Sequence, residues 1–89
     1  MSNVSVIERI RTLADQLQSG EISAESVADS LLGHVEALEG VDYDRIKEAQ
    51  FVWAQLSNAI AAGQRDAINT DAVAGFLRQW AQLVSQEVP

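Results

Sequence analysis

Apolar side chains recur at intervals of three and four residues in four separate stretches of the chain. In the first stretch, Val6, Ile10, Leu13, Ala14 and Leu17 follow this spacing, which places them on one face of an α-helix. The other stretches follow the same period. Together they predict helices over about residues 6–18, 24–39, 43–62 and 70–87.

Polar residues and glycines mark the ends of these stretches. Ser5 and Glu8 have the S-x-x-E spacing of a capping box, so they predict the start of the first helix. Side chains able to accept a hydrogen bond from a free backbone amide precede the other three: Ser23, Asp42 or Asp44, and Asn69 or Thr70. Gly20, Gly40 and Gly63 each follow an apolar stretch, as is typical where a helix ends in a left-handed residue.

The four helices predict the fold class. No stretch alternates apolar and polar residues with the period of a β-strand, and no Asn-Gly or Asp-Gly hairpin turn occurs. Short connections favour antiparallel neighbours. We therefore predict a single all-α domain spanning 1–89, an antiparallel up-down-up-down four-helix bundle that closes around Trp53 and Trp80.

Negative charge is concentrated in one third of the chain. No lysine or arginine occurs from Thr12 to Asp44, whereas eight acidic residues do, so we expect these eight charges to be uncompensated. The net charge of −7 argues against direct binding to nucleic acid, whose phosphates are recognised by basic side chains. It favours a basic protein as the partner, because opposite potentials accelerate encounter.

We predict that the partner-binding residues lie on the second predicted helix and in the turns on either side of it. Glu25, Asp29 and Glu36 share one helix face, and Gly33 lies among them. The full predicted set is Glu21, Glu25, Asp29, Glu36, Glu39, Asp42, Tyr43 and Asp44. Two alternatives stay open: the acidic face could serve solubility alone, and Gly33 could allow helix packing instead of close approach by a partner.

Catalytic motifs are absent from the sequence. His34 is the only histidine, there is no cysteine, and no nucleophile elbow, zinc-protease motif or phosphate-binding loop occurs. We therefore expect no enzymatic activity, no cofactor and no metal. Asp29-Ser30-Leu31 matches the tripeptide that carries the prosthetic group in acyl carrier proteins, but Ser30 falls in the middle of a predicted helix and not at its start.

The N-terminus carries charges and lacks the apolar run of a signal peptide, and no stretch approaches about 20 apolar residues. We expect a cytoplasmic protein that does not enter a membrane.

Residues 13–32, "LADQLQSGEISAESVADSLL", resemble the opening of the colicin D type immunity proteins. The resemblance implies a small, acidic bacterial bundle that blocks the basic cleft of a tRNA-cleaving toxin, with Glu21, Glu25 and Asp29 as the matching acids. We therefore predict an inhibitor that mimics nucleic acid electrostatically. The alternative is a helical adaptor or self-associating module without an inhibitory role, which exposed Phe51, Val52 or Leu32 would favour. The sequence leaves the oligomeric state open.

Overall fold

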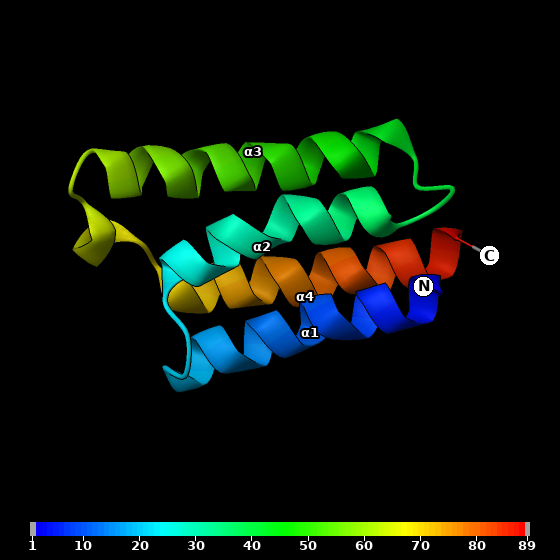
Figure 1. Ribbon diagram of the computed structural model, residues 1–89, viewed down its shortest axis with the longest axis horizontal. Helices are drawn as coiled ribbons and strands as arrows, with labels where there is room; N and C mark the ends of the chain where they lie inside the picture. The colour runs from blue at the N-terminus through cyan, green and yellow to red at the C-terminus, as the bar shows by residue number, and fades with distance from the viewer. Residues whose placement is uncertain (1, 89) are drawn as a thin grey trace.

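A computed structural model describes residues 2–88 of the chain. It contains four α-helices and one short 3-10 helix: α1 (Asn3–Ser19), α2 (Ala24–Ala37), α3 (Tyr43–Ala61), η1 (Arg65–Ala67) and α4 (Thr70–Glu87). No strand occurs within residues 2–88, so the all-α prediction of four helices is confirmed. The beginning of α1 and the end of α4 lie at the same end of the molecule (Figure 1).

The side chains that the sequence indicated as caps do cap α2 and α4, but not α1 and α3. Ser23 Oγ accepts from the amide of Ser26, and Asn69 Oδ1 accepts from the amide of Ala72. The predicted cap of the first helix is wrong, because α1 begins three residues earlier and Ser2 caps it by accepting from the amide of Ser5. Glu8 therefore lies inside the helix, where it pairs with Arg11 at 2.6 Å.

The turn between α1 and α2 is fixed by backbone geometry. Gly20 has a φ of 82°, which glycine adopts without the penalty that a Cβ would bring. Its amide and that of Glu21 donate to carbonyl groups in the last turn of α1, as in a Schellman motif. The second helix ends at Ala37, earlier than predicted, because Leu38 is already extended.

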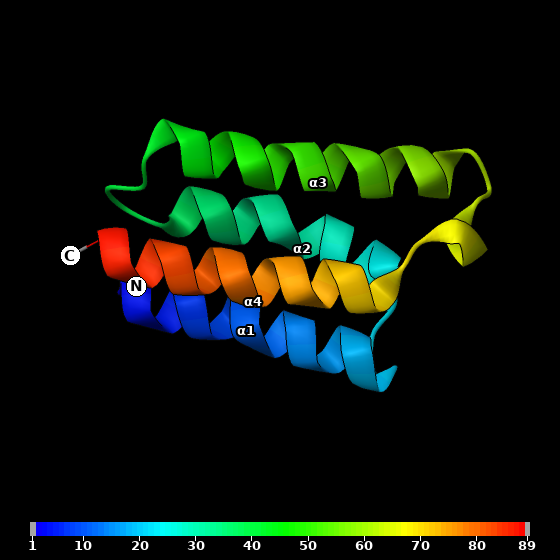
Figure 2. The same ribbon diagram turned by 180° about the vertical axis from the view of Figure 1, so that it is seen from behind.

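The buried core comes mainly from α1 and α4, which pack against each other more extensively than any other pair. Ala14, Ala74 and Ala81 are fully buried, and their small side chains allow the two backbones to approach closely. Arg78 of α4 also pairs with Asp15 of α1 at 2.8 Å. Figures 1 and 2 show α1 and α3 on opposite sides of the molecule.

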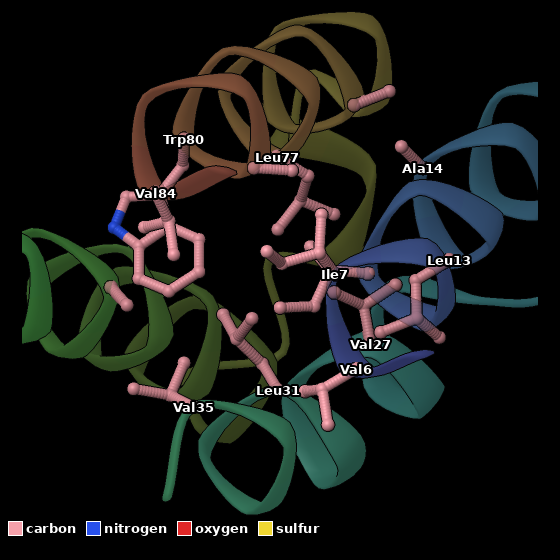
Figure 3. Packing of buried hydrophobic residues seen from close by; sticks show 14 of the residues in the cluster. Val6, Ile7, Leu13, Ala14, Val27, Leu31, Val35, Leu77, Trp80 and Val84 are labelled. Carbon is pink, nitrogen blue, oxygen red and sulfur yellow. The ribbon is translucent and has the colours of Figure 1, made fainter. Parts of the chain in front are cut away.

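Helix α3 is the least buried of the four long helices. Only Ala49 and Leu56 are buried on it, and it packs on α2 but makes few contacts with α4. The prediction of a core closed around both tryptophans is therefore half wrong. Trp80 is 2% exposed and points into the core (Figure 3), whereas Trp53 is only half-buried.

Trp80 also connects α4 to the start of α3. Its indole Nε1 donates to the carbonyl of Arg45 at 2.8 Å. The guanidinium of Arg45 donates to Glu48 at 2.6 Å and lies 3.5 Å from Glu87. Polar contacts thus attach the first turn of α3 to α4.

Candidate acidic interface

The predicted acids are arranged along α2 and its two flanking turns. Asp29 and Glu36 are exposed, and Glu25 is half-buried beside the end of α3. Glu25 and Asp29 border a hollow of about 210 Å³ with Ser57, Ile60 and Ala61 of α3. Glu25 and Asp29 therefore lie beside uncharged side chains at the end of α3.

Two acids of the cation-free stretch do have basic partners, which come from distant parts of the chain. Arg65 of η1 lies 2.5 Å from Glu25, and Arg78 of α4 lies 2.8 Å from Asp15. The expectation that all eight charges are uncompensated is therefore wrong. Within residues 2–88, no basic group lies within 4 Å of the carboxylates of the other six, which are Glu21, Asp29, Glu36, Glu39, Asp42 and Asp44.

The turn between α2 and α3 holds the second half of the predicted set in a fixed position. Asn3 accepts from the amide of Glu39 and donates to its carbonyl group, both at 2.9 Å. Asp42 occupies the N-cap position of α3, but its side chain makes no capping hydrogen bond. Glu39, Asp42 and Asp44 are exposed, so their carboxylates face solvent.

Tyr43 lies between two of these acids and is 66% exposed. The ammonium group of Lys47 lies 4.9 Å from the centre of its ring, the distance of a cation–π contact. The acids on the turn are thus followed at once by a cation, so the acidic surface does not continue along α3.

We name the exposed or half-exposed acids Glu21, Glu25, Asp29, Glu36, Glu39, Asp42 and Asp44 the acidic edge. At 1.5 Å per residue, the 14 residues of α2 span about 21 Å, and the acids of the two flanking turns lie beyond the ends of this helix. The charges of the acidic edge are spread out, and within the described part of the chain no three histidine or acidic side chains are close enough to hold a metal ion. The acidic edge can therefore contact several cations of a partner at once.

His34 adds no positive charge to α2. Burial and the nearby Arg9 lower the pKa of His34 below its ordinary value of 6.5. The imidazole is consequently neutral at pH 7. Ser30 lies in the middle of α2, and its hydroxyl donates to the carbonyl of Ser26 at 3.0 Å, a local bond within the helix.

Gly33 is exposed on α2, and a Cβ built there meets no heavy atom within 4 Å. Helix packing inside the molecule therefore does not require a glycine at position 33. The other interpretation of Gly33, close approach by a partner, stays a prediction. Gly75 of α4 is equally exposed and unobstructed.

We expect Gly33→Ala to raise the free energy of unfolding by about 1 kcal/mol, because alanine is favoured over glycine inside helices. Gly75→Ala is the matched control and should raise it by a similar amount. Urea denaturation followed by circular dichroism measures both. A lower stability for Gly33→Ala with a higher one for Gly75→Ala would mean that a side chain at position 33 does meet an obstacle.

The sequence pattern missed a second exposed surface, between α3 and α4. Phe76 follows the helical period of the apolar residues in the last helix, but it is only half-buried: it packs against the core and also borders a broad hollow beside Phe51. It stays half-exposed because α3 makes few contacts with α4. Phe51 is 64% exposed, which is a feature that the adaptor alternative requires.

Comparison of the chain with protein-family models, with characterised proteins and with solved structures found no match in any of the three. The likeness of residues 13–32 to colicin D type immunity proteins therefore stays a prediction. Among the helices of residues 2–88, none combines the length and apolar character needed to cross a membrane.

Proposed function

We propose that this chain is an antiparallel up-down-up-down four-helix bundle that inhibits a basic, nucleic-acid-binding protein, such as a nuclease toxin. The acidic edge enters the cationic cleft of the partner and takes the place of nucleic-acid phosphates. A cytoplasmic immunity protein of a bacterium would act in this way, and no catalytic step by the chain itself is needed.

The observation that carries this proposal is the row of unpaired carboxylates beside a fixed turn. Six acids keep no basic partner within 4 Å among residues 2–88, although Arg65 and Arg78 reach Glu25 and Asp15. The two hydrogen bonds between the side chain of Asn3 and the backbone of Glu39 hold the turn before any partner binds. A surface held in its binding conformation loses less conformational entropy on association, which favours affinity.

The first experiment is capture of partners from lysate of the native host, eluted with rising salt and identified by mass spectrometry. We expect a basic nuclease or nucleic-acid-binding protein that salt releases, because screening weakens contacts between exposed charges. The purified partner is then assayed for cleavage or binding of nucleic acid with and without this protein. A partner whose activity is unchanged by an excess of the protein would contradict the proposal.

Charge reversal locates the interface. Asp29→Lys combined with Glu36→Lys should weaken binding to that partner by roughly tenfold or more and flatten its salt dependence, because two attractive pairs become repulsive. The pair Asp15→Lys and Asp71→Lys, on the α1–α4 side, is the control, and circular dichroism checks its fold because Asp15→Lys breaks the ion pair with Arg78. Each reversal adds two charges, so both double variants change the net charge equally, from −7 to −3.

Equal weakening by both double variants would show that only net charge matters and would contradict the acidic edge as the interface.

Gly33→Ala tests how closely the partner approaches α2. If the partner approaches the helix closely, this variant weakens binding while its fold is stabilised, and Gly75→Ala leaves binding unchanged.

The alternative function, a helical adaptor with acidity serving solubility, is favoured by one observation. Phe51 is 64% exposed on α3, and Val52 and Leu32 are each half-exposed. An adaptor that docks through such apolar residues should hold its partner in high salt, and Asp29→Lys with Glu36→Lys should leave its binding unchanged.

A further inference from the structure

One acid of the acidic edge is paired with a basic side chain of the same protein. Arg65 of η1 lies 2.5 Å from Glu25, and within residues 2–88 no other acid of the acidic edge has a basic group within 4 Å. Arg65 comes from the loop between α3 and α4, far from Glu25 in the sequence. The fold thus brings one of its own guanidinium groups to the surface that we propose for a cationic partner.

The backbone around Arg65 places this side chain near the start of α2. Gly63 follows α3 with a φ of 72°, and the amide of Gln64 donates to the carbonyl of Ala59 at 2.8 Å. Ile68, just after η1, packs against the core. These contacts anchor the loop, so that η1 lies at the same end of the molecule as the start of α2 (Figures 1 and 2).

The pair between Arg65 and Glu25 is easily broken. The side chain of Arg65 is 63% exposed and that of Glu25 is 40% exposed, and η1 contains no buried residue. Water and salt screen such a pair, so it contributes little to the stability of the fold. Glu25 also lies in the first turn of α2, where the helix dipole favours a carboxylate without any help from Arg65. A stronger cationic competitor can therefore displace Arg65 while the fold stays intact.

The surroundings of Glu25 favour such a competitor. Asp29 follows one helical turn later, and both residues border the same hollow of about 210 Å³. Arg65 makes an ion pair with Glu25 alone, so the charge of Asp29 stays unpaired. A guanidinium group that enters the hollow can approach both carboxylates and has enough N–H donors for both. Two acids attract it more strongly than Glu25 alone attracts Arg65.

We propose that Arg65 is an autoinhibitory residue of the acidic edge. Its guanidinium occupies Glu25 in the free protein and is displaced by a guanidinium group of the basic partner, which lies between Glu25 and Asp29 in the complex. This inference rests on the proposed function, since it requires that the acidic edge binds a cationic partner. The internal pair lowers the affinity for any cation at Glu25, so a partner has to contact the other acids as well to bind tightly, which favours specificity.

Removal of Arg65 tests the proposal, with a fluorescently labelled deca-arginine peptide at low salt as the probe. Arg65→Gln should bind this peptide about two- to fivefold more tightly than the original chain, because the peptide no longer competes with an internal guanidinium. Circular dichroism checks the fold, which should persist because η1 contains no buried residue.

Arg78→Gln is the matched control for Arg65→Gln. It also removes a guanidinium from an exposed ion pair, but the acid that it frees is Asp15, which lies outside the acidic edge. Each variant loses one positive charge, so both change the net charge equally, from −7 to −8. Arg78→Gln should therefore raise the affinity for the peptide clearly less than Arg65→Gln does.

Glu25→Gln separates competition for Glu25 from simple repulsion of the peptide. If Arg65 acts by occupying Glu25, Arg65→Gln should lose most of its effect when Glu25→Gln is also present. A gain of the same size in both backgrounds would show that Arg65 only repels the peptide, and would overturn the proposal. Arg65→Lys keeps the charge and should bind the peptide about as tightly as the original chain.

Nuclear magnetic resonance of the arginine side chains shows the displacement directly. When unlabelled deca-arginine is added to isotope-labelled protein, the Nε–H signal of Arg65 should move toward its position in Glu25→Gln. The signal of Arg78 should stay in place, because its partner Asp15 lies outside the acidic edge. An Arg65 signal that does not move while the peptide binds would contradict displacement.

Failure of this inference is distinguishable from failure of the proposed function. Unchanged affinity in Arg65→Gln, or equal gains in Arg65→Gln and Arg78→Gln, would overturn the role of Arg65 although the peptide still binds. Absence of peptide binding, or binding that Asp29→Lys with Glu36→Lys does not weaken, would contradict the acidic edge and this inference with it. A native partner that binds with unchanged activity would contradict the inhibitory function alone.

Discussion

Replacing Trp80 by alanine should lower the free energy of unfolding by about 3 to 5 kcal/mol. The indole is 2% exposed, and it fills the space where α4 faces the start of α3 (Figure 3). Its removal leaves a cavity and also leaves the carbonyl of Arg45 without the indole donor that lies 2.8 Å away. A domain of this size is stabilised by only about 5 to 15 kcal/mol, so the loss is a large fraction of the total.

Trp53→Ala is the matched control for Trp80→Ala. Trp53 has the same side chain but is only half-buried on α3, so its loss should cost about 1 to 2 kcal/mol. Urea denaturation followed by circular dichroism measures both variants. Equal losses would mean that α3 is packed as tightly as α4, contrary to the burial of the two rings.

Replacing Leu31 by alanine should lower the free energy of unfolding by about 2 to 5 kcal/mol. Leu31 is fully buried, and it points from α2 toward the centre of the bundle (Figure 3). It lies two residues after Asp29, so the same helix anchors the core with one face and presents the acidic edge with another. Leu31→Ala should therefore weaken the binding of a partner only because a smaller fraction of the protein is folded.

Leu32→Ala is the matched control for Leu31→Ala. Leu32 is adjacent in sequence but half-exposed, so its truncation should cost less than about 1 kcal/mol. Thermal and urea unfolding of both variants provide the comparison. A larger loss for Leu32→Ala than for Leu31→Ala would mean that α2 is rotated about its axis relative to the structure.

The sequence predicted local structure correctly where one side chain determines it. Ser23 and Asn69 cap their helices because their short side chains reach a free amide in the next turn. The cap of α1 was misplaced because Ser2 and Ser5 both precede an apolar stretch, and the spacing to Glu8 favoured the second. The capping amide is that of Ser5 itself, so only the backbone geometry separates the two.

The candidate interface followed from the sequence only in part. The run without lysine or arginine identified the acids of α2, and they are exposed or half-exposed as a solvent-facing row requires. It did not identify Arg65 and Arg78 as partners of Glu25 and Asp15, which lie 40 and 63 residues away in the chain (65 − 25 and 78 − 15). Nor did it reveal that Phe76 is only half-buried, because Phe76 satisfies the helical period of a core residue.

The sequence by itself determined the number of helices, most of their ends and the excess of negative charge, because periodicity, capping and composition act over a few residues. The tertiary structure decided which apolar residues are buried, which acids pair with a basic side chain and which helices make few contacts with each other. Those outcomes depend on how closely one helix approaches another. Small buried alanines bring α1 and α4 together, while α3 rests on α2 and leaves Phe51 and Phe76 at the surface.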